Sequence, residues 1–121
     1  MSSEYKGAYL HFDITPNVSS DNPAYLQGMA GGLRKSTAVA VPLSMEMCML
    51  EDDQYTRLIF VTADIFAFDK MIVDSVRRHA LLWGIDSECI VLNASHTHYA
   101  PGTLAGMHEA MGPYYDNYAN Q

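Results

Sequence analysis

The sequence is poor in positive charge. Seven lysines and arginines stand against fourteen aspartates and glutamates, which gives a formal net charge of −7. A protein that binds nucleic acid needs a basic surface to face the phosphates, so this balance argues against DNA or RNA as a partner. The basic residues are scattered along the chain, which also argues against electrostatic attachment to an anionic membrane.

Long apolar runs and a leader are missing as well. No stretch approaches the roughly 18 apolar residues of a membrane-spanning helix, so we expect no transmembrane segment. The first residues contain no apolar signal core, and we therefore expect a cytoplasmic chain. Cysteine is scarce too. Cys48 and Cys89 lie in apolar runs, where we expect buried free thiols, with a single disulfide as the alternative.

Glycine-rich nucleotide fingerprints, phosphate loops and the nucleophile elbow of serine hydrolases are also absent. What the chain does have is enough apolar residues for a packed core, 49% of its 121 residues. This length fits one domain, and we treat residues 1–121 as a single unit.

Apolar patterning predicts three strands in the first half of the chain. Residues 8–14 alternate between apolar and polar side chains, which is typical of a strand. Residues 37–50 favour a long second strand. Residues 57–63 are nearly all apolar, as expected for a central strand covered on both faces. Residues 17–35 are rich in Gly, Asn, Asp and Ser and predict a long loop, in which the pair at residues 31–32 indicates a sharp turn or a close backbone approach.

The second half predicts a helix followed by a strand. Residues 69–83 begin with Asp69 as a plausible N-cap and are followed by Gly84 as a stop signal. Their apolar stripe consists of Ile72, Val73, Val76, Ala80 and Trp83. A second buried strand follows at residues 89–95. We therefore predict an α/β fold, with a mixed sheet that contains a parallel βαβ unit of strands at about 58–64 and 89–95 joined by the helix.

Polar residues follow both strands of that unit. Asp64 ends the first, and Ser-His-Thr-His at residues 95–98 ends the second. Ligands of parallel sheets bind beyond these carboxyl ends. Side chains two positions apart on an extended backbone point to the same side, so His96 and His98 could bind one zinc ion, the metal that neutral imidazole suits well. Asp64 could orient a histidine or bind substrate. Two hydrogen-bonded loop histidines and a turn aspartate are the alternative.

The other histidines have weaker claims. His11 and His79 are expected to face solvent, and His108 lies in a stretch from which it could reach a metal. Asp13 fits an Asx turn before Pro16. Tyrosines at the carboxyl end favour the first turns of a helix that is cut short, so we expect a fragment of a larger domain.

The order of these segments resembles the amino-terminal region of the neutral/alkaline, non-lysosomal ceramidase family. Asp-Ile-Thr-Pro at residues 13–16 is similar to the family's opening strand, Thr-Ala-Asp at 62–64 to its second strand end, and Ser-His-Thr-His-Tyr-Ala-Pro-Gly at 95–102 to its histidine loop. The similarity runs from about residue 8 to 103. The chain departs from the family pattern at Tyr99-Ala100, where Ser-Gly is usual, and at residues 38–42.

The resemblance implies a zinc-dependent hydrolase that cleaves the amide of ceramide into sphingosine and a fatty acid, a reaction of sphingolipid metabolism. It implies that His96 is a zinc ligand and that His98 lies beside the metal and contacts the substrate or the developing oxyanion. Asp64 corresponds to the family's strand-end aspartate. The remaining ligands would come from sequence beyond this chain, so we expect it to be inactive alone. Family members are often secreted.

Two other functions remain open at this point. One is a small non-catalytic α/β domain that binds a partner or has a structural role, in which the histidines only form hydrogen bonds. The other is a metal hydrolase that acts on a different amide or ester.

Overall fold

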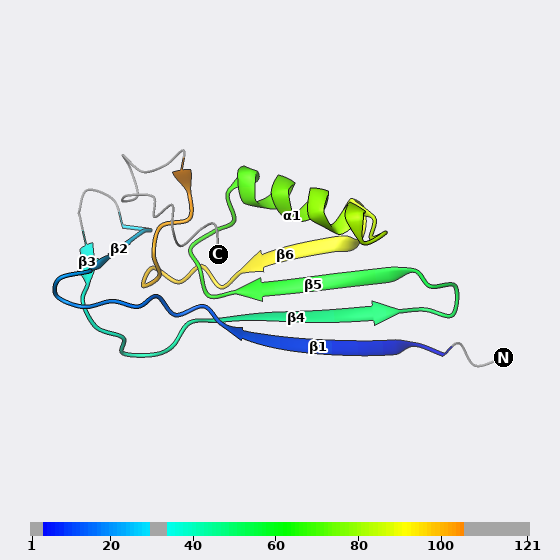
Figure 1. Cartoon of the computed structure of the whole chain (residues 1–121), viewed down its shortest axis with the longest axis horizontal. Helices are drawn as coiled ribbons and strands as arrows, with labels where there is room; N and C mark the ends of the chain where they lie inside the picture. The colour runs from blue at the N-terminus through cyan, green and yellow to red at the C-terminus, as the bar shows by residue number, and fades with distance from the viewer. Residues whose placement is uncertain (1–3, 30–33, 106–121) are drawn as a thin grey trace.

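The computed structural model describes residues 4–29 and 34–105. Four strands form the main sheet in the order β1-β4-β5-β6. β1 (Lys6–Asp13), β4 (Ser44–Glu51) and β5 (Arg57–Ala63) pair in antiparallel fashion, and β6 (Ile90–Ala94) is parallel to β5. The predicted α/β class with a mixed sheet and a parallel βαβ unit is confirmed, and β1, β5 and β6 all run in the same direction (Figure 1).

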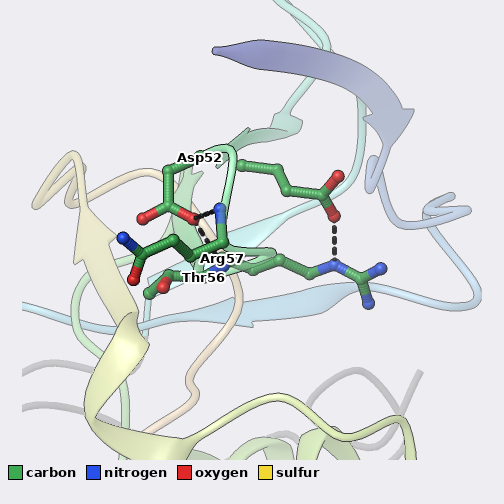
Figure 2. Close-up of polar contacts among 5 residues, drawn as sticks. Asp52, Thr56 and Arg57 are labelled. Atoms are coloured by element: carbon green, nitrogen blue, oxygen red, sulfur yellow. Dashed lines mark hydrogen bonds and ion pairs between the residues drawn. The ribbon is translucent and has the colours of Figure 1, made fainter. Parts of the chain in front are cut away.

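The β4–β5 connection is a tight turn at the end of the sheet far from β2 and β3 (Figure 1). The Asp52 carboxylate accepts hydrogen bonds from the backbone N–H groups of Thr56 at 2.7 Å and Gln54 at 2.9 Å, as Figure 2 shows. Beside it, Arg57 Nε donates to a Glu51 carboxylate oxygen at 2.7 Å. These contacts fix the register of the hairpin at its closed end.

Helix α1 (Lys70–Leu82) joins β5 to β6 and packs on one face of the sheet (Figure 1). Its capping follows the sequence. The Asp69 carboxylate accepts from the N–H of Met71 at 2.9 Å, and Gly84 ends the helix with a φ of 70°. The short 3-10 helix η1 (Ser87–Cys89) leads into β6. The core between helix and sheet is made of Ile59, Val61, Ala80 and Ile90.

Two predictions about the first half of the chain are wrong in part. The expected loop at residues 17–35 contains β2 (Ala24–Leu26) and the start of β3 (Arg34–Ser36), which pair as an antiparallel hairpin. The expected strand at residues 37–50 is regular only from Ser44 onward. A three-residue strand is too short to show periodicity, so contacts with distant residues decide its conformation.

Burial also differs from expectation, because within the described residues only the sheet face toward α1 is covered. Ile59, Val61 and Ala63 of β5 are buried, whereas Leu58 and Phe60 on the other face are 37% and 41% exposed. Cys48 lies on that open face in register with Phe60 and is exposed, and Cys89 is half-buried. Both thiols are free, as expected, but the prediction that both are buried is wrong.

The apolar stripe of α1 is confirmed at its centre and fails at its end. Ala80 is buried and Val76 packs against the core. Trp83 is 78% exposed, because the helix ends there and Ile85 instead turns back onto the sheet. In the described part of the chain, no helix combines the length and the apolar character needed to cross a bilayer.

Candidate functional site

Three strand ends meet at one edge of the sheet, and the β2–β3 hairpin lies beyond that edge (Figure 1). Asp13 ends β1, Asp64 follows β5 and Ser95 follows β6. Backbone hydrogen bonds between the strands continue up to this edge. The N–H of Asp64 donates to Ser44 O and the N–H of Ser95 donates to Ala63 O, both at 2.9 Å. Ligands of parallel α/β sheets generally bind beyond such an edge, and Asp64 and the histidine loop both begin there.

The Asp64 carboxylate is held by β4. Its Oδ2 accepts from both the backbone N–H and the hydroxyl of Ser44, each at 3.1 Å. The Ser44 N–H is the largest cause that lowers the pKa of Asp64 below its ordinary value, and the hydroxyls of Ser95 and Ser44 add to it, while burial opposes them. Asp64 is therefore an ionised, partly buried carboxylate tied to two neighbouring strands. Asp13 differs, because its carboxylate accepts from the N–H of Thr15 at 2.8 Å, which confirms the expected Asx turn.

His96 is fixed by the segment after β5. Its Nδ1 lies 2.9 Å from the carbonyl oxygen of Phe66, and its ring stacks on the Phe66 ring with centroids 4.4 Å apart. A carbonyl can only accept, so Nδ1 carries the proton, and in the neutral ring Nε2 keeps its lone pair. The backbone of His96 has a φ of 63°, in the left-handed region that few residues other than glycine adopt.

His98 lies against the same aromatic ring. Its ring centroid is 5.0 Å from that of Phe66 and 4.9 Å from that of His96, edge-on to both. The two imidazoles are therefore neighbours, as predicted, but for a different reason. The left-handed turn at His96 breaks the extended backbone that the prediction assumed, and Phe66 brings the rings together at an interplanar angle of 84°.

Asp64 and the histidine rings have separate surroundings. A cavity of about 520 Å³ is lined by Asp64, Thr97 and Tyr99 together with mostly apolar residues of the 15–18 and 36–43 segments, and neither histidine is part of its lining. The proton on His96 Nδ1 points to Phe66, so the carboxylate of Asp64 is not the group that orients this ring. Of the two roles considered for Asp64, contact with a ligand in this cavity fits the geometry better.

Among residues 4–29 and 34–105, no three His, Cys, Asp or Glu side chains gather where they could hold a metal. A catalytic zinc uses about three protein ligands, and this part of the chain brings two imidazoles together. His108 and the tyrosines near the carboxyl end lie outside the described residues. His11 is exposed, as expected. His79 is exposed in the last turn of α1, with Nδ1 2.8 Å from Ser75 O.

Several residues of the site were missed from the sequence. Gln27, Gly28 and Arg34 come from the hairpin, and Phe66 from the β5–α1 connection; all four contact the histidine loop or its exit. The available signal was the glycine-rich composition of residues 28–32, which indicated a close backbone approach but favoured the pair at 31–32, outside the described residues. The close approach that the structure describes is at Gly28.

Comparison with known proteins gives likenesses of structure alone. No description of a protein family matches the sequence, and no curated protein does. A solved structure titled as a ceramidase complexed with C2 is similar over 96% of this chain and 19% of its own, with a TM-score of 0.74 at 22% identity. The crystal structure of neutral ceramidase from Pseudomonas aeruginosa is similar over 84% of this chain and 16% of its own, with a TM-score of 0.65 at 22% identity.

The chain thus spans about a fifth of the length of the ceramidase structures that it matches. At this identity the likeness concerns the fold, and in that sense the resemblance expected from the sequence is confirmed. This chain has the fold of a portion of the neutral ceramidases.

Proposed function

We propose that this chain forms part of a zinc-dependent amide hydrolase that acts on a lipid amide of the ceramide type. Two independent observations support the proposal. The fold is that of a portion of two ceramidases, and the histidine loop at residues 95–102 resembles the histidine loop of the ceramidase family. The observation that carries it is the paired arrangement of His96 and His98, with His96 Nδ1 occupied by the Phe66 carbonyl.

The residues present fit a zinc ion in part. Zinc-binding histidines commonly donate their second ring N–H to a carbonyl, which fixes the tautomer and directs the other nitrogen at the metal. His96 has this arrangement, so its Nε2 would be the ligand atom. A bound zinc ion would lower the pKa of a water ligand and polarise the amide carbonyl. The other ligands would come from residues outside those described here, and the activity belongs to the larger protein.

The remaining roles follow from position. His98, beside His96, would contact the substrate or the oxyanion that develops on the amide carbonyl. Asp64 is held ionised at the wall of the apolar cavity, and we assign it to binding the polar part of the substrate there. The apolar lining contributed by residues 36–43 suits a lipid chain.

The test is the zinc content of the full-length protein, measured by inductively coupled plasma mass spectrometry after dialysis. We expect about one zinc per chain in the wild type and a large loss in His96→Ala. His79→Ala is the matched control, because His79 also has Nδ1 against a backbone carbonyl but lies on the exposed face of α1. Equal zinc in wild type and His96→Ala would reject the site and favour a non-catalytic binding or structural domain.

Activity is measured separately, as release of fatty acid from a short-chain ceramide. We expect His98→Ala to lower kcat strongly while leaving the zinc content near that of the wild type. Release from other amides or esters, without release from ceramide, would keep the hydrolase and change the substrate.

A further inference from the structure

We propose that Gln27 and Gly28, which directly follow β2, are positioning residues that set the location of the His98 ring. This inference rests on the proposed function only for its catalytic consequence. The positioning itself is a statement about packing and hydrogen bonds.

Gln27 holds the exit of the histidine loop. It is completely buried at 0% exposure. Its side-chain oxygen accepts from the N–H groups of Thr103 at 3.0 Å and Leu104 at 2.9 Å, and its Nε2 donates to Leu104 O at 2.9 Å. Its backbone N–H donates to Ala100 O at 3.3 Å. A buried amide is costly unless it is bonded, so these contacts lock the backbone that follows the histidines to the hairpin.

Gly28 supports the His98 ring directly. A Cβ at this position would lie 2.9 Å from both Cγ and Nδ1 of His98 and 2.8 Å from Cδ2 of Phe66. Real Cβ contacts are almost never this short, and the imidazole has little room to retreat because Phe66 and His96 border it. The φ of Gly28 is 115°, which also disfavours any other residue. The ring of His98 therefore rests on a surface that only glycine provides.

The hairpin contacts the loop at a third point. The guanidinium of Arg34, at the start of β3, donates a hydrogen bond to the carbonyl oxygen of His98 and lies 3.5 Å from the carbonyl oxygen of Gln27. It also lies over the Tyr99 ring, 5.4 Å from the centroid. The ring, the carbonyl and the exit of the His98 segment are thus each held by the hairpin. A displaced hairpin would displace His98 relative to His96, which is anchored independently on Phe66.

The decisive variant is Gly28→Ala, with Gly84→Ala as its matched control. Both glycines have positive φ, but a Cβ at Gly84 meets nothing within 4 Å. Both variants therefore place a Cβ on a backbone of positive φ, 115° at Gly28 and 70° at Gly84, but only Gly28→Ala adds the collision with His98 and Phe66. The measurement is the ¹³C–¹H spectrum of the full-length protein with selectively labelled histidine, recorded without metal, in which the His98 signal is the one missing from His98→Ala.

We expect the His98 signal to move in Gly28→Ala, because the ring leaves its place at the edge of Phe66, and to stay in place in Gly84→Ala. Cobalt titration of the same proteins should give an affinity for Gly28→Ala close to that of the wild type, because His96, the proposed ligand, is anchored on Phe66, while kcat should fall as in His98→Ala. Unmoved His98 resonances in a folded Gly28→Ala protein would overturn the inference. Should the wild type bind no cobalt while the His98 signal still moves, the positioning would stand and the zinc proposal would fall.

Gln27→Glu gives a second test should Gly28→Ala not fold. A glutamate keeps the acceptor for the two N–H groups but loses the donor to Leu104 O. We expect a smaller displacement of the His98 signal and a fall in kcat larger than the change in KM. An unchanged signal and unchanged kcat would show that the buried amide supports the fold alone, which would also overturn the inference.

Discussion

The hydrogen bonds of Asp64 at the strand-end edge give a prediction about stability whose size can be worked out from the structure. Its carboxylate accepts two hydrogen bonds from Ser44, one from the backbone N–H and one from the hydroxyl, each at 3.1 Å. Both bonds join the end of β5 to the beginning of β4. The perturbation is Asp64→Ala, which removes both acceptor sites, compared with Asp64→Asn, which keeps an oxygen in place and removes the charge.

The expected size follows from the number and kind of bonds. A hydrogen bond to a charged group contributes about 1.5–3 kcal/mol, and these lie at the weak end because the carboxylate is partly exposed and the bonds are long. We expect Asp64→Ala to lower the free energy of unfolding by about 2 kcal/mol and Asp64→Asn by about 1 kcal/mol. Ser44→Ala should cost about 0.5–1 kcal/mol, since it loses the hydroxyl bond alone.

The assay is urea denaturation of the four proteins and of the double variant Ser44→Ala/Asp64→Ala. The cycle should give a coupling of about 0.5–1 kcal/mol, because the two single variants remove the same hydroxyl–carboxylate bond. Asp13→Ala is the matched control, because its carboxylate lies at the end of β1, on the other side of β4, and bonds within its own turn. Strictly additive effects, or a greater loss in Asp13→Ala, would refute the reasoning.

The pH dependence gives a second reading of the same group. The folded pKa of Asp64 is lowered, chiefly by the Ser44 N–H, so the folded state favours the charged form. Its contribution is complete above the unfolded pKa of about 3.9 and is lost as the pH falls through the lower folded value. The stability difference between wild type and Asp64→Asn should therefore be constant from pH 7 to about 5 and shrink below about 4. A difference that grows on acidification would contradict the assigned hydrogen bonds.

Two further predictions concern parts of the fold away from the site. Asp52→Ala should lower the urea midpoint more than Asp53→Ala, because Asp52 accepts the turn N–H groups shown in Figure 2 while Asp53 is an exposed neighbour; equal midpoints would contradict this. Ile59→Ala should cost about 2–4 kcal/mol, since this side chain is only 7% exposed in the core under α1, whereas Trp83→Ala should stay within about 0.5 kcal/mol at 78% exposure; a larger loss for Trp83 would contradict the packing.

The elements that the sequence predicted well are those specified by local signals. The N-cap at Asp69, the left-handed glycine at Gly84 and the 3.6-residue apolar repeat between them define α1 within one or two residues. The flanking strands are continuous apolar runs of ordinary length, so the βαβ unit follows from short-range information. The hairpin of β2 and β3 escaped prediction because its conformation depends on distant partners, such as the bond from the Gly102 N–H to Tyr25 O.

The site shows the same division. The location of Asp64, His96 and His98 could be predicted from the sequence, because they directly follow the two strands of the βαβ unit. The side chains that surround them could not be predicted. Phe66 reaches His96 across 30 residues and Gln27 reaches Leu104 across 77, and no periodicity encodes such separations. Burial of Cys48 and Phe60 was predicted because both lie in apolar runs. Apolar character alone does not determine whether other residues cover a sheet face, and within the described residues this face is open.

The left-handed backbone at His96 shows that tertiary contacts, and not the local sequence, set the geometry of the two histidine rings. A non-glycine residue in this region costs about 1 kcal/mol or more, so the loop alone would prefer the extended form in which two imidazoles point the same way. The observed turn persists because Phe66 binds the His96 ring through its carbonyl and its aromatic face, while Gly28 leaves room for His98. The geometry of the two rings is thus set by three segments that meet at one sheet edge. A short histidine motif with the same spacing, placed in another fold, would not reproduce it.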